Sequence, residues 1–160
     1  MRLPILALAI LIPTAPLLAA QDSSPRQMME ALGVAPSHRD VARAVERARN
    51  EPLGSSRNPV RVSGVGGEHA YIGRLRCSDG SRPRVGDRYN AGVGVFGSIV
   101  DVWPLDCGSA APGRFELVLD MYHDNYEETR APAGFSLTPA GESRREDSAP
   151  EKPAPADPTV

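Results

Sequence analysis

Hydrophobic positions in the first third of the chain recur every three or four residues, which is the period of an amphipathic α-helix. The clearest run lies between Ser37, a residue type favoured at helix N-caps, and Pro52, which stops a helix. A shorter helix is predicted from Pro25 to Leu32, with Ser24 as its cap and proline in the favoured first position. The N-terminal region is therefore predicted to hold two helices.

From residue 58 onward the period changes to two, which predicts β-strands. Four strands are predicted, at residues 60–65, 68–77, 92–103 and 114–122. The third is apolar on both faces, as expected of a strand inside a sheet that is covered on both sides. The fourth alternates cleanly, with its apolar residues predicted to point inward: Phe115, Leu117, Leu119 and Met121.

The order of these elements predicts an α+β fold. Because turns rather than helices join the predicted strands, we expect an antiparallel sheet of about four strands, with the N-terminal helix pair packed on it. The glycines of the third strand would permit sharp bending, so a small rolled, barrel-like sheet is the alternative.

The two ends of the chain read as segments outside the folded domain. Residues 1–20 combine Arg2, an apolar stretch and small residues at Ala19 and Ala20, the layout of a signal peptide cleaved after Ala20. Residues 138–160 are rich in proline and alanine and are expected to be disordered. A single exported domain, periplasmic or secreted, is therefore predicted over residues 21–137, with no transmembrane span after cleavage.

The two cysteines, Cys77 and Cys107, are predicted to form a disulfide, since an even cysteine count is typical of an exported chain. Each lies at the end of a predicted strand, which suits a bridge between neighbouring strand ends. The absence of a C-x-x-C motif disfavours the alternative of a redox-active thiol.

Charge and motif patterns exclude several classes of ligand. The net charge of −2 does not suggest nucleic acid as a partner. Residues 92–97 spell G-x-G-x-x-G, but a polar loop precedes the motif and a β-branched segment follows it, the reverse of a dinucleotide-binding context. The only lysine is Lys152, so the lysine of a protein kinase is missing as well. No cofactor is predicted, and the glycines are interpreted as positions of bending or close packing.

Titratable residues gather at the end of the fourth predicted strand. Asp120, His123 and Asp124 could act as general acid and base or bind a divalent metal, with His69 joining only if the second and fourth strands pair in the right register. No spacing typical of metal ligands supports a metal site, and a solvated strand end is the alternative. We therefore predict no metal centre and keep these four residues as candidate catalytic residues.

A second candidate surface is the loop before the third predicted strand. It carries Arg82, Arg84, Arg88 and Tyr89, and arginine and tyrosine are favoured at interaction hot spots. These residues predict a contact surface for a protein partner of the cell envelope.

Residues 76–80, Arg-Cys-Ser-Asp-Gly at the end of a predicted strand, loosely resemble the Cys-x-x-Gly element of periplasmic C-type lysozyme inhibitors. The sequence as a whole favours a non-enzymatic binding or envelope-accessory module. A metal-binding protein or hydrolase centred on His123, and a lysozyme-inhibitor-like protein, are the alternatives.

Overall fold

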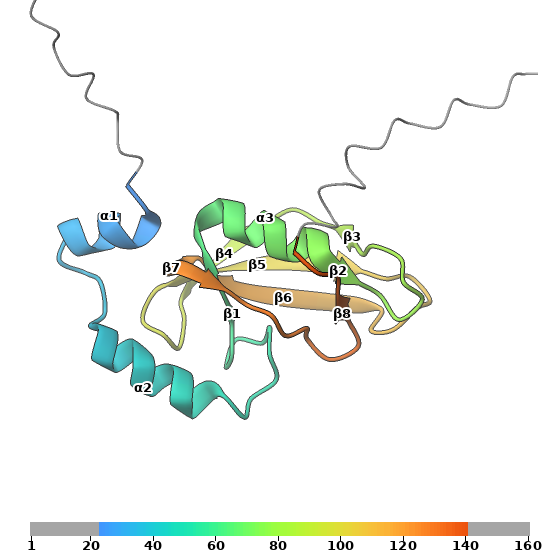
Figure 1. The fold of residues 1–160 in the computed structure, drawn as a ribbon, viewed down its shortest axis with the longest axis horizontal. Coiled ribbons are helices and arrows are strands. Elements are labelled where there is room, and N and C mark those ends of the chain that lie inside the picture. The colour runs from blue at the N-terminus through green and yellow to red at the C-terminus, as the bar shows by residue number, and fades with distance from the viewer. Residues whose placement is uncertain (1–22, 141–160) are drawn as a thin grey trace, which may run out of the picture.

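The computed structural model describes residues 23–140 (Figure 1). The predicted signal peptide and all but the first three residues of the predicted tail lie outside the described residues. The elements in chain order are α1 (Pro25–Ala31), α2 (His38–Ala48), β1 (Val60–Ser63), α3 (Gly64–Arg74), β2 (Leu75–Arg76), β3 (Arg84–Val85), β4 (Tyr89–Val93), β5 (Ile99–Asp106), β6 (Arg114–Asp120), β7 (Tyr122–Glu127) and β8 (Ser136–Leu137).

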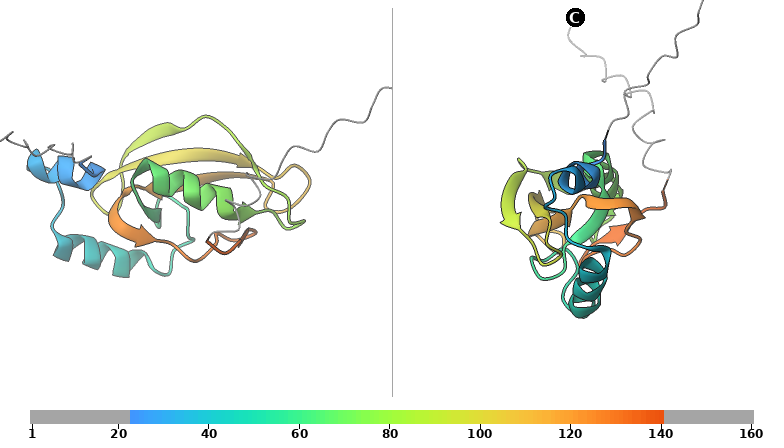
Figure 2. Two further views of the ribbon diagram at one scale, coloured as in Figure 1. Left: turned by 45° about the horizontal axis from the view of Figure 1, so that its top comes forward. Right: turned by 90° about the vertical axis from the view of Figure 1, so that its left-hand side faces the viewer.

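The main sheet is mixed and curled like half a barrel around α3 (Figure 2). Its strand order is β3-β5-β6-β1-β7, and β4 also pairs with β5, while β2 and β8 form a separate pair. The α+β class is confirmed. The expectation of an entirely antiparallel sheet is wrong, because β1 runs parallel to β6. Parallel strands need a long connection, and residues 64–113 supply one.

The prediction of a second strand at residues 68–77 is wrong for most of its length, because residues 64–74 form the helix α3. Glu68, Tyr71 and Ile72 are spaced as one face of a helix, and all three are buried. The glycines at 64, 66 and 67 form the first turn of this helix. Burial of an apolar face against the sheet outweighs the poor helix propensity of glycine.

The third predicted strand is two strands, because a tight turn at residues 94–98 separates β4 from β5. The amide of Gly94 donates to the carbonyl of Ser98 at 2.8 Å, and Gly97 adopts φ +85°, which favours glycine. A Cβ on Gly94 would collide with Val100. Bending and close packing therefore explain the G-x-G-x-x-G motif.

The main core lies between α3 and the sheet. The four inward positions predicted on the fourth strand all pack there, and Leu117 and Leu119 are fully buried. The helix that covers the sheet is α3, not the N-terminal pair (Figure 1). α2 instead packs small residues, Ala44 and Ala48, against Phe96 in the turn between β4 and β5.

The predicted disulfide is confirmed: Cys77 and Cys107 are bonded, with their Cα atoms 5.8 Å apart. The bond joins the residue after β2 to the residue after β5, so it ties the end of the α3 segment to the sheet. Among residues 23–140, no helix is both long and apolar enough to cross a membrane.

Candidate functional site

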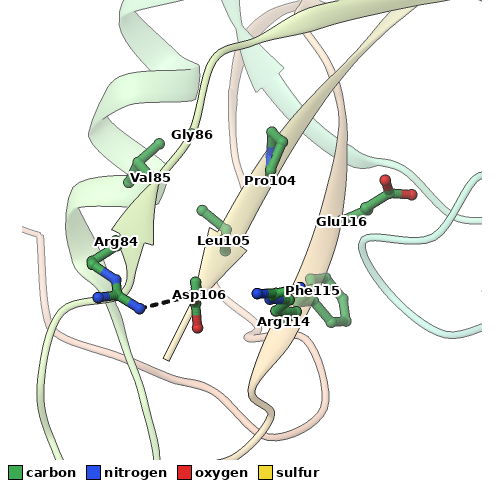
Figure 3. Close-up of a pocket in the computed structure, with 9 residues that line it drawn as sticks. All are labelled: Arg84, Val85, Gly86, Pro104, Leu105, Asp106, Arg114, Phe115 and Glu116. Carbon is green, nitrogen blue, oxygen red and sulfur yellow. Dashed lines mark hydrogen bonds and ion pairs between the residues drawn. The ribbon is translucent and has the colours of Figure 1, made fainter. Parts of the chain in front are cut away.

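The predicted arginine and tyrosine loop lies on β3 and at the start of β4, where its side chains are mostly engaged. Arg84 donates to Asp106 at 2.8 Å across the β3–β5 pair, beside a groove of about 420 Å³ (Figure 3). The Tyr89 hydroxyl donates to Glu116 at 3.2 Å. Arg82 is exposed in the segment before β3.

Arg88 is the residue of this loop that reaches inward. Its Nη1 lies 3.3 Å from Glu68 Oε2 and 3.4 Å from Asp101 Oδ2, so one guanidinium bridges two buried carboxylates. The indole of Trp103 also donates to Glu68, at 3.4 Å. We call Glu68, Arg88, Asp101 and Trp103 the Glu68 cluster.

Burial raises the pKa of Glu68 to about 7, and the negative charge of Asp101 adds to this effect, while Arg88 and Trp103 act in the opposite direction. Glu68 is fully buried, and its Oε1 has no hydrogen-bond partner within residues 23–140. Near neutral pH this carboxyl can therefore hold or release a proton inside the protein.

Sequence reasoning missed the Glu68 cluster. Glu68 fell within the predicted strand 68–77, and no role was predicted for Glu68 or Asp101. The available signal was the helical spacing that Glu68 shares with Tyr71 and Ile72, which places it on the face of α3 that meets the sheet.

The structure brings together only part of the predicted titratable cluster of Asp120, His123, Asp124 and His69. Asp120 is fully buried; it accepts a hydrogen bond from the Ser98 hydroxyl and lies 3.4 Å from Nε2 of His123. Asp124 follows on β7, where its Oδ2 accepts from Ser24 at 3.0 Å. His69 does not join them; it lies on α3 with its ring edge-on to Trp103.

A cavity of about 380 Å³ lies beside this cluster, between the N-terminal helices and β7. We call it the His123 pocket. It is lined by Arg26, Gln27, Glu30, His38, Val41, Tyr122, His123, Asp124 and Tyr126. Within residues 23–140, no group of three or more His, Cys, Asp or Glu side chains is placed to hold a metal ion.

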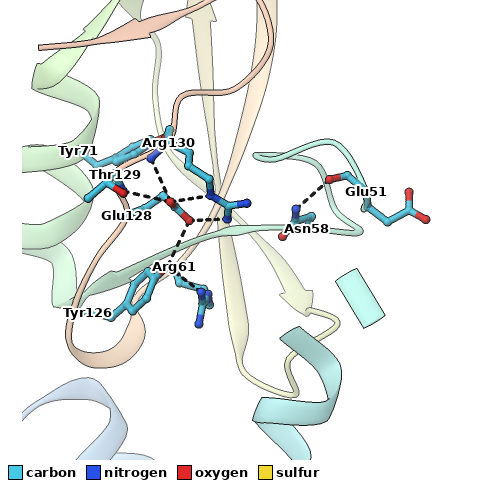
Figure 4. A network of polar contacts seen from close by, with 8 residues as sticks. All are labelled: Glu51, Asn58, Arg61, Tyr71, Tyr126, Glu128, Thr129 and Arg130. Carbon is cyan, nitrogen blue, oxygen red and sulfur yellow. Dashed lines mark hydrogen bonds and ion pairs between the residues drawn. The ribbon is translucent and has the colours of Figure 1, made fainter. Parts of the chain in front are cut away.

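The buried carboxylate of Glu128, by contrast, accepts hydrogen bonds from neighbouring residues of the fold (Figure 4). Burial alone would raise its pKa, but hydrogen bonds from the Arg130 side chain and from the backbone at Thr129 and Arg130 lower it. Tyr126 also donates to Glu128 and in turn accepts a hydrogen bond from Arg61 at 2.7 Å. The acceptor oxygens of Glu128 are thus occupied, and this network stabilises the loop after β7.

Exposed apolar side chains gather around β4. Five of the nine large exposed hydrophobic residues of the described chain lie on β3, β4, the following turn and the start of β5. They are Val85, Tyr89, Val93, Val95 and Ile99. Three of them, Tyr89, Val93 and Val95, line a groove of about 550 Å³ on the face of the sheet opposite α3. We call these five residues and the groove the β4 face.

The outer edge of β4 is also open. All five residues of β4 are exposed, and among residues 23–140 this strand pairs only with β5. An unpaired strand edge presents backbone donors and acceptors that another extended chain can use.

Comparison of the chain with protein-family models, with curated proteins and with solved structures finds no match.

Proposed function

We propose that this protein is an exported, non-enzymatic binding module, periplasmic or secreted, that accepts an extended segment of a partner protein along β4. The observation that carries this proposal is the coincidence of an open strand edge with a concentration of exposed apolar side chains. Strand addition uses both features, because backbone hydrogen bonds supply affinity and pockets for alternate side chains supply specificity.

The groove of the β4 face suits this mode of binding. Tyr89 lies opposite Val102 in the β4–β5 pair, and both line the groove together with Val118 on β6. A strand added to β4 would place every second side chain on the face of the sheet that bears the groove, beside Tyr89 and Val93. Val93 is 74% exposed at the end of β4, so binding would remove it from water.

Export is supported by the disulfide, because such bonds persist in oxidising compartments. The predicted signal peptide points the same way, and a cell-envelope protein is the partner class that we propose. The resemblance to lysozyme inhibitors covers a tight turn in which the amide of Gly80 donates to the carbonyl of Cys77.

The test is selection of peptides of about twelve residues, long enough to span a typical strand, from a random library displayed on phage. We expect enriched peptides to slow hydrogen exchange at the amides of residues 89–93. Val93→Asp should abolish their binding. Val34→Asp is the matched control, because Val34 is 60% exposed beyond α1 and does not line the groove of the β4 face.

Methylation of the peptide backbone nitrogens separates strand addition from simple apolar contact. Methylated peptides should lose binding, because each methyl group removes a donor from the ladder. Enrichment of no peptide, protection of amides elsewhere, or equal binding by Val93→Asp and Val34→Asp would refute the proposed function.

A further inference from the structure

We propose that Glu68 and Arg88 form a proton-controlled latch that fastens the start of β4 to α3. Arg88 directly precedes Tyr89, the first residue of β4, and its guanidinium reaches Glu68 on α3. Uptake of a proton by the Glu68 cluster weakens this contact and loosens the segment that leads into β4. The latch operates in the protein without a bound peptide, so the inference does not rest on strand addition, and either proposal can fail without the other.

The Glu68 cluster holds more acid than base in a buried space. Glu68 and Asp101 are both buried, and Nη1 of Arg88 lies 3.3 Å and 3.4 Å from their carboxylate oxygens. When both carboxyls are ionised, one guanidinium faces two negative charges that are shielded from water and repel each other. A proton taken up by one carboxyl removes the excess negative charge.

Glu68 is the carboxyl that takes up this proton. Its Oε1 is buried and has no hydrogen-bond partner within residues 23–140, so the ionised form is poorly compensated there. Burial and the charge of Asp101 favour the neutral form, and with Arg88 in place the pKa of Glu68 is about 7. The change of charge therefore falls near neutral pH.

The other ionisable groups near this cluster come from α3 and from two strands packed against it: His69 on α3, Asp120 on β6 and Tyr122 on β7. Burial and the nearby carboxylates raise the pKa of Tyr122, so its hydroxyl stays neutral near pH 7. Asp120 accepts a hydrogen bond from Ser98, and His69 is exposed. Within residues 23–140 none of the three forms an ion pair or a hydrogen bond with Glu68, so Arg88 is the cation that compensates its charge.

Proton uptake and the release of Arg88 favour each other. Arg88 stabilises the ionised form of Glu68 and so lowers its pKa; with Arg88 detached, Glu68 binds its proton more tightly. By reciprocity, protonated Glu68 holds Arg88 less tightly than ionised Glu68 does. The Arg88 side chain is 38% exposed, so water can solvate the guanidinium once it leaves Glu68. Asp101 keeps its attraction for Arg88, so the latch is loosened below neutral pH and closed above it.

The experiment is limited digestion of the native protein at pH 8 by trypsin, which cleaves after arginine. Cleavage after Arg88 requires the surrounding segment to open, so its initial rate reports that opening. Glu68→Gln carries no charge at this pH, as in the protonated state, and should raise the initial rate about fivefold, the factor that corresponds to one partly exposed ion pair. The disulfide holds the cut chain together, so the products are identified by mass spectrometry after denaturation and reduction.

Glu46→Gln is the matched variant, because it removes the same charge from an exposed position on α2. It should be cut after Arg88 at the rate of the unaltered protein. A second measurement needs no variant: the NMR order parameter of the Arg88 Nε–Hε bond in the unaltered protein should fall from pH 8 to pH 5.5. The midpoint of this change should coincide with the titration of the Glu68 carboxyl carbon.

Two results of the digestion would overturn the latch: cutting after Arg88 that is equal or slower in folded Glu68→Gln, or cutting that Glu46→Gln accelerates to the same extent. An Arg88 order parameter that is the same at both pH values would overturn it as well. So would a change whose midpoint differs from the titration of Glu68.

Discussion

Replacing Glu68 by glutamine tests the electrostatics of the Glu68 cluster most directly. Glutamine has nearly the shape of a protonated glutamic acid and keeps an oxygen that can accept from Arg88 and Trp103, but it does not ionise. The substitution therefore removes the buried negative charge and leaves the packing of α3 on the sheet in place. We expect Glu68→Gln to stabilise the protein above neutral pH.

The sign and size follow from the pKa of Glu68, which is about 7 in the folded protein against 4.5 in the unfolded chain. Because the folded state holds the proton more tightly, stability is greatest below pH 4.5 and falls as the pH rises toward 7. The loss is about 3 kcal/mol in the free energy of unfolding. Glu68→Gln should be free of this loss, so it should exceed the unaltered protein by about 3 kcal/mol at pH 8 and by less than about 1 kcal/mol at pH 5.

The assay is urea denaturation of both proteins at several pH values from 5 to 9, followed by tryptophan fluorescence of Trp103 and by circular dichroism. Glu46→Gln is the control, since its carboxylate is exposed and its removal should change stability by less than about 1 kcal/mol at any pH. If Glu68→Gln is less stable than the unaltered protein at pH 8, or if their difference does not vary with pH, the assignment of a raised pKa to Glu68 is wrong.

Two further predictions concern the backbone and the disulfide. Gly94→Ala should destabilise the protein by more than about 1 kcal/mol, because the added Cβ collides with Val100. Gly66→Ala in α3 should leave stability unchanged or raise it by up to about 1 kcal/mol. Thermal melts compare the two variants, and equal melting temperatures would contradict the prediction. Replacing Cys77 and Cys107 together by alanine should lower the free energy of unfolding by about 3–4 kcal/mol, the loop-closure value for cysteines 30 residues apart, and urea denaturation that shows no loss would refute this contribution.

Local signals predicted the elements in which one face is buried and the ends are marked. α1 and α2 begin directly after Ser24 and Ser37, the predicted caps, and both serine side chains accept a backbone hydrogen bond. β6 alternates because one of its faces packs against α3, so its inward residues could be read directly. The disulfide followed from the cysteine count and the predicted export.

The errors occur where one local pattern fits two structures. Residues 64–74 contain glycines and apolar residues compatible with either a strand or a helix, and contact with the sheet selects the helix. Residues 92–103 read as one long strand because both of their faces are apolar, but the hydrogen bond between Gly94 and Ser98 turns the chain. In both places long-range packing, which a local window does not contain, decides the conformation.

The candidate sites divide in the same way. The sequence alone placed Asp120, His123 and Asp124 close together, because they are neighbours along the chain, and it identified Arg88 and Tyr89 as members of one loop. Only the tertiary structure showed that His69 lies apart from His123.

By itself, the sequence determined the α+β class, the N-terminal helices, the alternation of β6 and the pairing of the two cysteines, because each depends on neighbouring residues or on a count. The tertiary structure alone decided the parallel pairing of β1 with β6, the open edge of β4, the burial of Glu68 against Asp101 and the cavity between α1 and β7. These features join segments far apart in the chain. Burial and charge interactions depend on distances in space, and the order of residues does not specify those distances until the chain has folded.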